Sequence, residues 1–231
     1  MRFVFPPAPQ AALAVAGSTD HFPVRRVFCV GRNYAAHARE FGNDPDRDPP
    51  FFFTKPADAV VNTPCTVPYP PLTEDLHFEI ELVIAIGKGG ADIAAADVPD
   101  HIWGASVGID LTRRDLQNEA KKMSRPWDWS KAFDHSAPIA PIVPMADVPS
   151  LTQGRIWLAV NGEIKQDADI ADLIWPVADH IATLSQAMTL APGDIIMTGT
   201  PAGVGAGTPG DVMTGGVDGI AELEVTVGPR A

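Results

Sequence analysis

Apolar residues along this chain of 231 residues occur mostly in short runs bounded by glycine, proline, asparagine or aspartate. Runs of this length that are rich in Val, Ile and Phe are typical of β-strands. We therefore expect strands within residues 25–31, 51–61, 76–87, 102–110, 155–168, 195–201 and 220–227. The strongest local signal is Asn161-Gly162, which lies between two such runs and predicts a β-hairpin.

Three segments show helical features instead. Helices are expected over residues 33–42, 111–123 and 176–190. In the first, Asn33 is a candidate N-cap and Gly42 a candidate stop. The second is rich in charged residues and follows a predicted strand directly. In the third, Ile181, Leu184 and Met188 are spaced by three and four residues, which predicts one apolar helix face.

The order of these elements indicates the fold class. Predicted strands outnumber predicted helices, and strand and helix do not alternate regularly, so a doubly wound parallel sheet is not expected. We predict a mainly β domain with a few helices, of the α+β class. Residues 1–20, rich in proline and alanine, are expected to form an N-terminal arm, and residues 21–231 a single catalytic domain.

Composition excludes several classes of protein. The net charge is −12, and no run of Lys or Arg stands out, which argues against a nucleic-acid partner. No stretch of about 18 uninterrupted apolar residues predicts a membrane span. Prolines at positions 6, 7 and 9 argue against a signal peptide, and the apolar run around Cys29 predicts a buried, unreactive thiol. A cytoplasmic protein is expected.

One predicted strand carries an unusual pair of carboxylates. In the stretch LHFEIELVIAIG, His77, Glu79 and Glu81 lie two residues apart and therefore share one face of the strand. A half-exposed strand with an acidic outer face is the ordinary explanation. However, the residues that follow are apolar on both faces, as in a buried strand. Two buried carboxylates on one face would repel each other unless a cation neutralised them.

A divalent metal ion would supply that charge. Asp110 ends another predicted strand and offers a third carboxylate, although it could equally be the N-cap of the helix that follows. Three carboxylates suit a hard cation such as Mg²⁺ or Mn²⁺, with Ca²⁺ as an alternative in crystals. This set of ligands does not include the His and Cys residues typical of a zinc site. His77 could support this site or simply lie at the surface.

A second candidate pair is His37 and Glu40. Positions i and i+3 share a face of a helix, so the carboxylate could orient the imidazole and raise its basicity. A surface histidine near a glutamate usually has no function. Its interest here depends on the neighbouring metal site.

Several of these segments together resemble one known family. The motifs are VGRNYAAHARE, FFFTKPADAVV, FEIELVIAIG, GIDLTRRDLQ, SKAFD, VNGEIKQ and PGDIIMTGTPAGVG. Their order and spacing, from about Val27 to the C-terminus, resemble the fumarylacetoacetate hydrolase family. The run KKMSRPWDWSKAFD further resembles its short bacterial acylpyruvate hydrolases, particularly those that act on fumarylpyruvate in gentisate breakdown.

The resemblance assigns roles to individual residues. It implies that metal is held by Glu79, Glu81 and Asp110, catalysis is carried by His37, Glu40 and Lys131, and substrate is contacted by Arg114, Gln117 and Thr200. For Lys55, a structural ion pair and a role in the site both remain open. The family also implies a mixed β-sandwich roll and a homodimer.

The reaction implied by the resemblance is hydrolysis of a C–C bond in a 2,4-diketo acid. His37, oriented by Glu40, would activate water to attack the distal carbonyl group, and Lys131 would stabilise the departing pyruvate enolate. Fumarylpyruvate would give fumarate and pyruvate. The alternatives are an oxaloacetate decarboxylase or tautomerase with the same site, and a structural protein that binds a divalent metal.

Overall fold

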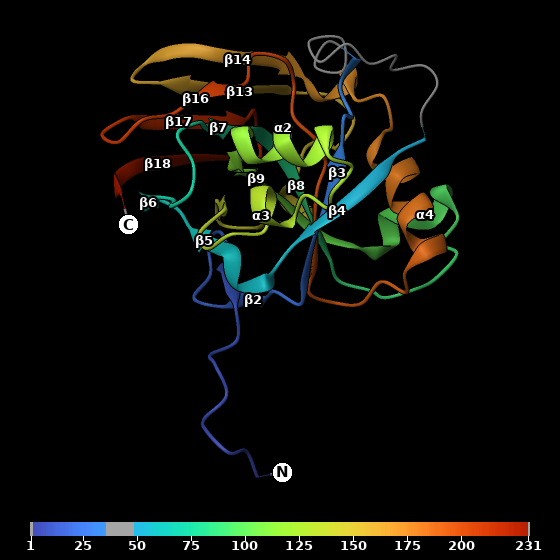
Figure 1. Ribbon diagram of the computed structural model, residues 1–231. Helices are drawn as coiled ribbons and strands as arrows, with labels where there is room; N and C mark the ends of the chain where they lie inside the picture. The colour runs from blue at the N-terminus through green and yellow to red at the C-terminus, as the bar shows by residue number, and fades with distance from the viewer. Residues whose placement is uncertain (1, 36–48, 231) are drawn as a thin grey trace.

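The computed structural model describes residues 2–35 and 49–230, and its described part is built mainly from β-strands, with a few short helices (Figure 1). The prediction of a mainly β protein is confirmed. The strands form four sheets, and the largest occupies the centre of the molecule.

The central sheet is mixed and holds eight strands. Seven follow one another in the order β4 (Phe51–Lys55), β3 (Arg26–Gly31), β15 (Asp194–Met197), β8 (Ile80–Ile86), β9 (Ile102–Ile109), β11 (Ala137–Ile139) and β5 (Val60–Asn62). The eighth, β12 (Val143–Pro144), pairs with β9. Strand β8 is antiparallel to β9, and this pair later positions the site.

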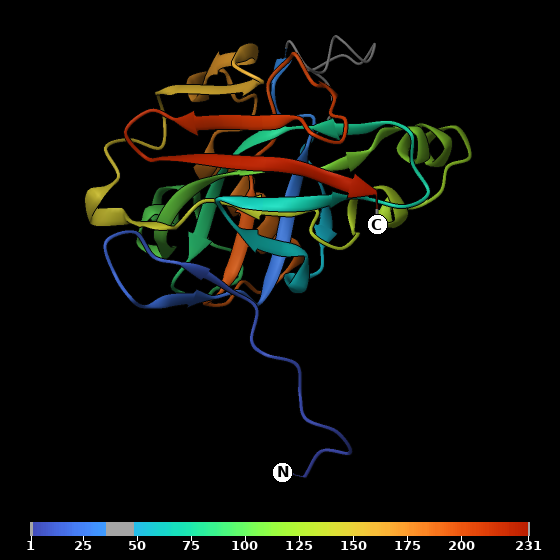
Figure 2. The same cartoon turned by 90° about the vertical axis from the view of Figure 1, so that its left-hand side faces the viewer.

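A second sheet of five strands lies beside the first. It is at upper left in Figure 1, and its strands run across the view in Figure 2. Its order is β14 (Glu163–Asp169), β13 (Arg155–Val160), β17 (Val212–Val217), β18 (Ala221–Arg230) and β6 (Cys65–Tyr69). Two small sheets complete the set. They are β10 (Thr112–Arg113), β7 (Leu76–Phe78) and β16 (Gly205–Ala206), and the pair β1 (Ala12–Ala14) and β2 (His21–Pro23).

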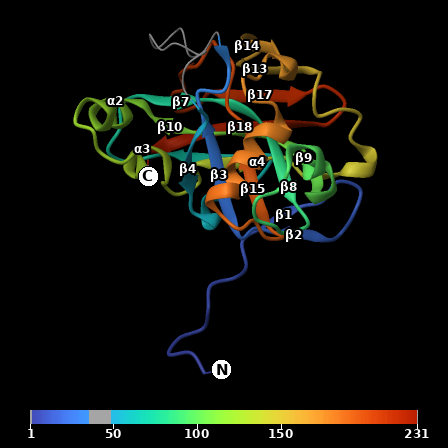
Figure 3. The same ribbon diagram turned by 90° about the vertical axis from the view of Figure 1, so that its right-hand side faces the viewer.

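Helices among the described residues are short. The α-helices are α2 (Arg114–Lys122), α3 (Asp128–Lys131) and α4 (Val177–Ala187). The 3₁₀ helices are Ala57–Ala59, Ala95–His101, Met145–Asp147 and Ile170–Asp172. Helices α2 and α3 lie together near β10 and β4, whereas α4 lies beside the 3₁₀ helix Ala95–His101 on another side of the molecule (Figure 3).

The two faces of the central sheet pack into different apolar cores. Phe28 and Ile84 lie on the face that meets α4 and the five-stranded sheet. Cys29 and Val83 lie on the opposite face, which packs against residues of β1 and β2 such as Leu13. Part of the predicted N-terminal arm thus contributes to the core, whereas the first residues extend away from the body in all three views. Alternation of side chains in buried strands explains this division.

Most local predictions agree with the structure. The hairpin turn at Asn161 and Gly162 has φ values of 52° and 83°, as a tight turn between two strands requires. Cys29 is fully buried, and burial raises the pKa of its thiol well above the ordinary value. Met188 lies beyond the end of α4 and is exposed, so its placement on the apolar helix face is wrong. Most of the helix predicted over 33–42 lies outside the described residues.

Candidate active site

The three predicted carboxylates meet at one end of the β8–β9 pair. Glu79 lies directly before β8, Glu81 lies on β8, and Asp110 follows β9. The antiparallel register places Ile80 opposite Ile109, and the N–H of Asp110 donates to the carbonyl oxygen of Glu79 at 2.8 Å. One oxygen atom from each carboxylate lies within 4.8 Å of the others, and all three residues are buried.

Asp110 is not a helix cap. Helix α2 begins at Arg114, its N-cap is Arg113, and the short strand β10 separates both from Asp110. The alternative interpretation of Asp110 from the sequence is therefore wrong. Its carboxylate is instead directed toward Glu79, Lys131 and Lys55.

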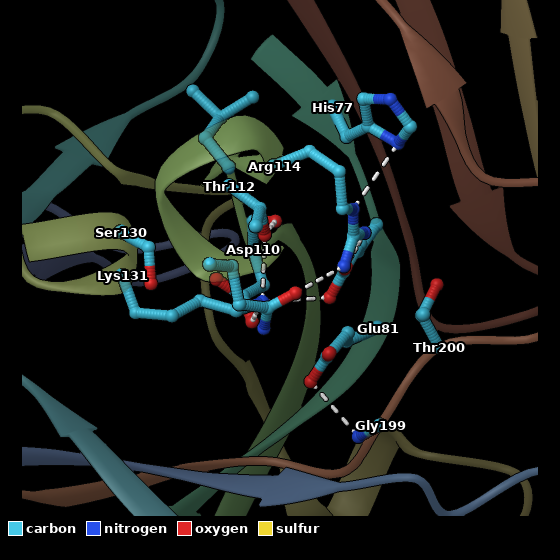
Figure 4. A network of polar contacts seen from close by, with 12 residues as sticks. His77, Glu81, Asp110, Thr112, Arg114, Ser130, Lys131, Gly199 and Thr200 are labelled. Atoms are coloured by element: carbon cyan, nitrogen blue, oxygen red, sulfur yellow. Dashed lines mark hydrogen bonds and ion pairs between the residues drawn. The ribbon is translucent and has the colours of Figure 1, made fainter. Parts of the chain in front are cut away.

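Two buried lysines, Lys131 and Lys55, neutralise part of this negative charge. The Nζ of Lys131 lies 2.5 Å from Asp110 Oδ2 and 2.8 Å from Glu79 Oε2, and it donates to Thr112 Oγ1 at 2.6 Å (Figure 4). Burial alone lowers the pKa of Lys131, but Asp110 and Glu79 outweigh it and raise the pKa above its ordinary value. The Nζ of Lys55 lies 2.8 Å from Asp110 Oδ1. Lys55 therefore forms a buried ion pair that is also part of the site.

Glu81 is held differently from the other two carboxylates. Its Oε2 accepts a hydrogen bond from the N–H of Gly199 at 2.8 Å (Figure 4). Burial, followed by the negative charges of Asp110 and Glu79, raises the pKa of Glu81 well above its ordinary value. A cation at this point would favour the ionised form. The donor set of three buried carboxylates therefore fits a hard divalent ion such as Mg²⁺ or Mn²⁺.

Helix α2 brings Arg114 and Gln117 to the same site. Arg114 forms an ion pair with Glu79, and its Nη1 donates to Gln117 Oε1 at 2.5 Å, as expected for residues one helical turn apart. Its Nε also donates to Nδ1 of His77 at 3.3 Å. His77 Nε2 in turn lies 2.9 Å from Asp75 Oδ1. His77 is therefore a partner of Arg114.

The protonation of His77 agrees with this arrangement. Burial, followed by the positive charge of Arg114, lowers the pKa of His77. A neutral imidazole can accept the Arg114 N–H at Nδ1 and donate to Asp75 from Nε2. Arg114 thus connects His77 to Glu79, which meets Glu81 in the triad.

Thr200 lies to the right of Glu81 in Figure 4, whereas Asp110 and Lys131 lie to its left. Its Oγ1 accepts a hydrogen bond from Gln166 Nε2 at 2.8 Å. Gln166 is fully buried on β14, and its Oε1 accepts from the N–H of Ile80 at 3.0 Å. Sequence reasoning gave no role to Gln166, although it belongs to one of the seven motifs.

The predicted metal and substrate residues line a single pocket with Lys131. The pocket wall includes Glu79, Glu81, Asp110, Arg114, Gln117, Lys131 and Thr200. It also includes Arg32, Phe53, Lys121 and Trp127, none of which was assigned a role from sequence patterns. The charged residue pattern of 111–123 could have suggested Lys121, but no pattern pointed to the aromatic residues. His37 and Glu40 lie outside the described residues, so their role stays a prediction.

The fold and this acidic site, faced by buried lysine and arginine side chains, have a counterpart among known proteins. The chain belongs to the fumarylacetoacetate hydrolase family, because the family model described as "Fumarylacetoacetate (FAA) hydrolase C-terminal" matches residues 26–228.

Individual relatives are similar over most of the chain. A fumarylpyruvate hydrolase from Ralstonia sp is 47% identical over 78% of this chain and 93% of its own length. A mitochondrial oxaloacetate decarboxylase from Dictyostelium discoideum is 40% identical over 85% of this chain and 90% of its own. The crystal structure of fumarylpyruvate hydrolase from Pseudomonas aeruginosa in complex with Mn²⁺ and pyruvate matches this fold with a TM-score of 0.97 at 51% identity. The match covers 99% of this chain and 100% of that chain.

None of the helices within residues 2–35 and 49–230 has the length and apolar character to span a bilayer.

Proposed function

We propose that this protein is a metal-dependent hydrolase that cleaves the C–C bond of acylpyruvates, with fumarylpyruvate as its substrate. The observation that carries the proposal is the buried triad of Glu79, Glu81 and Asp110, which lies beside Lys131 and Arg114 in one pocket. The similarity to fumarylpyruvate hydrolases supports the choice of acyl group.

The triad would hold the divalent ion. When bound there, Mg²⁺ or Mn²⁺ supplies a Lewis acid that polarises oxygen atoms of a keto acid. The charge balance is consistent with this role. Three buried carboxylates face three buried cations, Lys55, Lys131 and Arg114, so a divalent ion leaves a positive site for a dianionic substrate.

The protein's own side chains would then bind and orient the substrate. Arg114 would offer N–H groups to the oxygen atoms of the substrate, Gln117 a side-chain amide, and Thr200 a hydroxyl group. Lys131 lies where its ammonium group can stabilise negative charge on an enolate oxygen. His37, oriented by Glu40, would take a proton from the attacking water.

The overall reaction is R–CO–CH₂–CO–COO⁻ + H₂O → R–COOH + CH₃–CO–COO⁻. Water adds its oxygen to the distal carbonyl carbon, and the bond from that carbon to the methylene carbon breaks. The electron pair passes to the pyruvate fragment as an enolate, which is then protonated at carbon. Fumarylpyruvate yields fumarate and pyruvate.

Oxaloacetate decarboxylation or tautomerisation is the second candidate. The specific observation in its favour is the 40% identity to an oxaloacetate decarboxylase. Hydrolysis, decarboxylation and tautomerisation all pass through the same kind of enolate, but of the three only hydrolysis requires attack of water on a carbonyl carbon.

One experiment separates the two candidates. The protein is incubated with Mn²⁺ in ¹⁸O-labelled water together with fumarylpyruvate, acetylpyruvate or oxaloacetate, and the products are identified by mass spectrometry. Hydrolysis predicts pyruvate and a labelled carboxylic acid from the acylpyruvates. Carbon dioxide release from oxaloacetate, with no cleavage of either acylpyruvate, would contradict the proposal.

The remaining expectations from the sequence belong to the same proposal. They are a homodimer, a cytoplasmic location, a role in the breakdown of aromatic compounds, and a single catalytic domain over residues 21–231 that follows an N-terminal arm.

A further inference from the structure

A second pocket, with aromatic walls, lies next to the site pocket. The two pockets share Arg32, Phe53, Trp127 and Lys131 in their walls, so the second pocket adjoins the space at the triad. The ring centroid of Trp127 lies 5.4 Å from that of Phe51, nearly perpendicular to it, and 5.7 Å from that of Phe53. Aromatic walls of this kind suit a flat, conjugated group.

Arg32 enters this region through an unusual backbone conformation. Its φ is 54°, in the left-handed region that non-glycine residues rarely adopt. The preceding Gly31 leaves room for the ring of Phe51, because a Cβ atom at Gly31 would lie only 2.0 Å from that ring. The guanidinium of Arg32 lies over the Phe51 ring, 4.9 Å from its centroid. The end of β3 is thus shaped to place this cation at the junction of the two pockets.

Lys121 adds a second cation from helix α2. The residue is solvent-exposed and lines the site pocket, and its Nζ lies 5.2 Å from the centroid of Trp127. Partial burial of the ammonium group, and then the positive charge of Arg114, lower the pKa of Lys121 to about 8. The negative charge of Glu79 opposes this shift, and the positive charges of Lys131 and Arg32 add to it, so four cationic groups act on one another across this space. Such a group of like charges favours an anionic ligand.

We propose that Arg32 and Lys121 bind a carboxylate at the far end of the acyl group, while Phe51, Phe53 and Trp127 hold a planar acyl chain between the two ends of the substrate. This inference rests on the proposed function, because it assumes that the pyruvate end lies at the triad. It identifies the substrates as acylpyruvates whose acyl group is unsaturated and ends in a carboxylate. Oxaloacetate, whose second carboxylate adjoins the methylene carbon, is too short to use this subsite.

The test compares fumarylpyruvate with acetylpyruvate, whose acyl group has no carboxylate. The ratio of their kcat/KM values, measured with Mn²⁺, is determined for the unaltered protein, Lys121→Met and Arg32→Lys. Loss of one charge-assisted hydrogen bond is expected to lower the ratio about tenfold in Lys121→Met. Lys122→Met is the matched control, because Lys122 is the next residue of α2 and does not line the described pocket; its ratio should not change.

A fall of about threefold or more in the kcat/KM ratio of Lys121→Met or Arg32→Lys, with the ratio of Lys122→Met unchanged, supports the subsite. A smaller change in both, or an equal change in Lys122→Met, overturns it. Calorimetry provides a test that needs no turnover, with fumarate and crotonate as probes in the presence of Mn²⁺. Fumarate must bind more tightly than crotonate, and Lys121→Met must reduce the difference; equal binding of the two acids overturns the inference. If neither acylpyruvate is cleaved, the proposed function fails, and the calorimetric result still decides on the subsite.

Discussion

The Nζ of Lys55 and the Oδ1 of Asp110 lie 2.8 Å apart, and both side chains are inaccessible to solvent. The same ammonium group donates to the carbonyl oxygens of Leu111 and Lys131, so it connects β4 to the end of β9 and to α3. Lys55 therefore fixes the position of one proposed metal ligand and of the lysine that faces it.

Replacement of Lys55 by Met should destabilise the protein strongly. Removal of one partner leaves the buried carboxylate of Asp110 without this cation, which typically costs about 3–5 kcal/mol. The free energy of unfolding, measured in urea, checks this value. Lys165→Met is the control, because Lys165 pairs with the exposed Glu163 and should cost less than about 1 kcal/mol. Similar losses in the two proteins would show that the Lys55–Asp110 pair has no special importance.

Replacement of Glu81 by Gln should remove stabilisation by metal. Mn²⁺ at about a hundredfold excess over its Kd should stabilise the unaltered protein by about 2.7 kcal/mol. Glu81→Gln should lose most of this gain, yet its metal-free form should be no less stable, because burial and neighbouring carboxylates already disfavour the charged form of Glu81. Thermal unfolding with and without Mn²⁺ measures both effects. Glu224→Gln, at an exposed position of β18, is the control. Full stabilisation of Glu81→Gln by Mn²⁺ would exclude Glu81 as a ligand.

His77 should act on the reaction through Arg114. Substitution by Phe removes the acceptor of the Arg114 Nε–H, and a lost hydrogen bond to a charged group costs enough to lower kcat/KM about tenfold. Because Arg114 is proposed to bind substrate, KM should rise more than kcat falls. Steady-state kinetics with fumarylpyruvate separate these constants. His21→Phe, at an exposed position, should behave as the unaltered protein. Unchanged constants for His77→Phe would refute the positioning role.

These contacts show where sequence reasoning succeeded and where it could not. Period-two alternation predicted one face for His77, Glu79 and Glu81, because a strand fixes side-chain direction locally. In the structure Arg114 contacts both His77 and Glu79, and Glu79 meets Glu81 in the triad. The ion pair between Lys55 and Asp110 joins two strands that are far apart in sequence, and no local pattern encodes it. The presence of Arg32, Lys121 and Trp127 in one pocket likewise depends on how distant segments of the chain come together in the folded protein.

The start of helix α2 differs between the prediction and the structure. The charged segment 111–123 predicted α2 well, but the short strand β10 delays its start to Arg114, and this displaces the cap from Asp110. Strand pairing of Thr112 with His77 outweighs the local preference of an aspartate for the cap position. The family motifs compensated for this ambiguity, because they assigned Asp110 to the metal.

His180 should make stability depend on pH. It is fully buried on α4, its Nδ1 donates to the carbonyl oxygen of Trp175 at 3.1 Å, and burial lowers its pKa to about 4. As pH falls below about 6.5, the unfolded chain binds a proton that the folded protein does not, so stability decreases until about pH 4. The loss from this residue approaches about 3 kcal/mol. The free energy of unfolding, measured in urea between these pH values, should change less with pH in His180→Leu than in the unaltered protein. An identical change in the two proteins would contradict this account.

The central claim is that the carboxylate triad holds a metal ion that is required for cleavage of an acylpyruvate. Its most direct test is product analysis of fumarylpyruvate incubated with the unaltered protein, first in Mn²⁺ and then after removal of the metal with a chelator. The account predicts equimolar fumarate and pyruvate with Mn²⁺, a large loss of rate after chelation, and recovery when Mn²⁺ is restored. Absence of pyruvate in the presence of Mn²⁺, or an undiminished rate in the chelated protein, would contradict it.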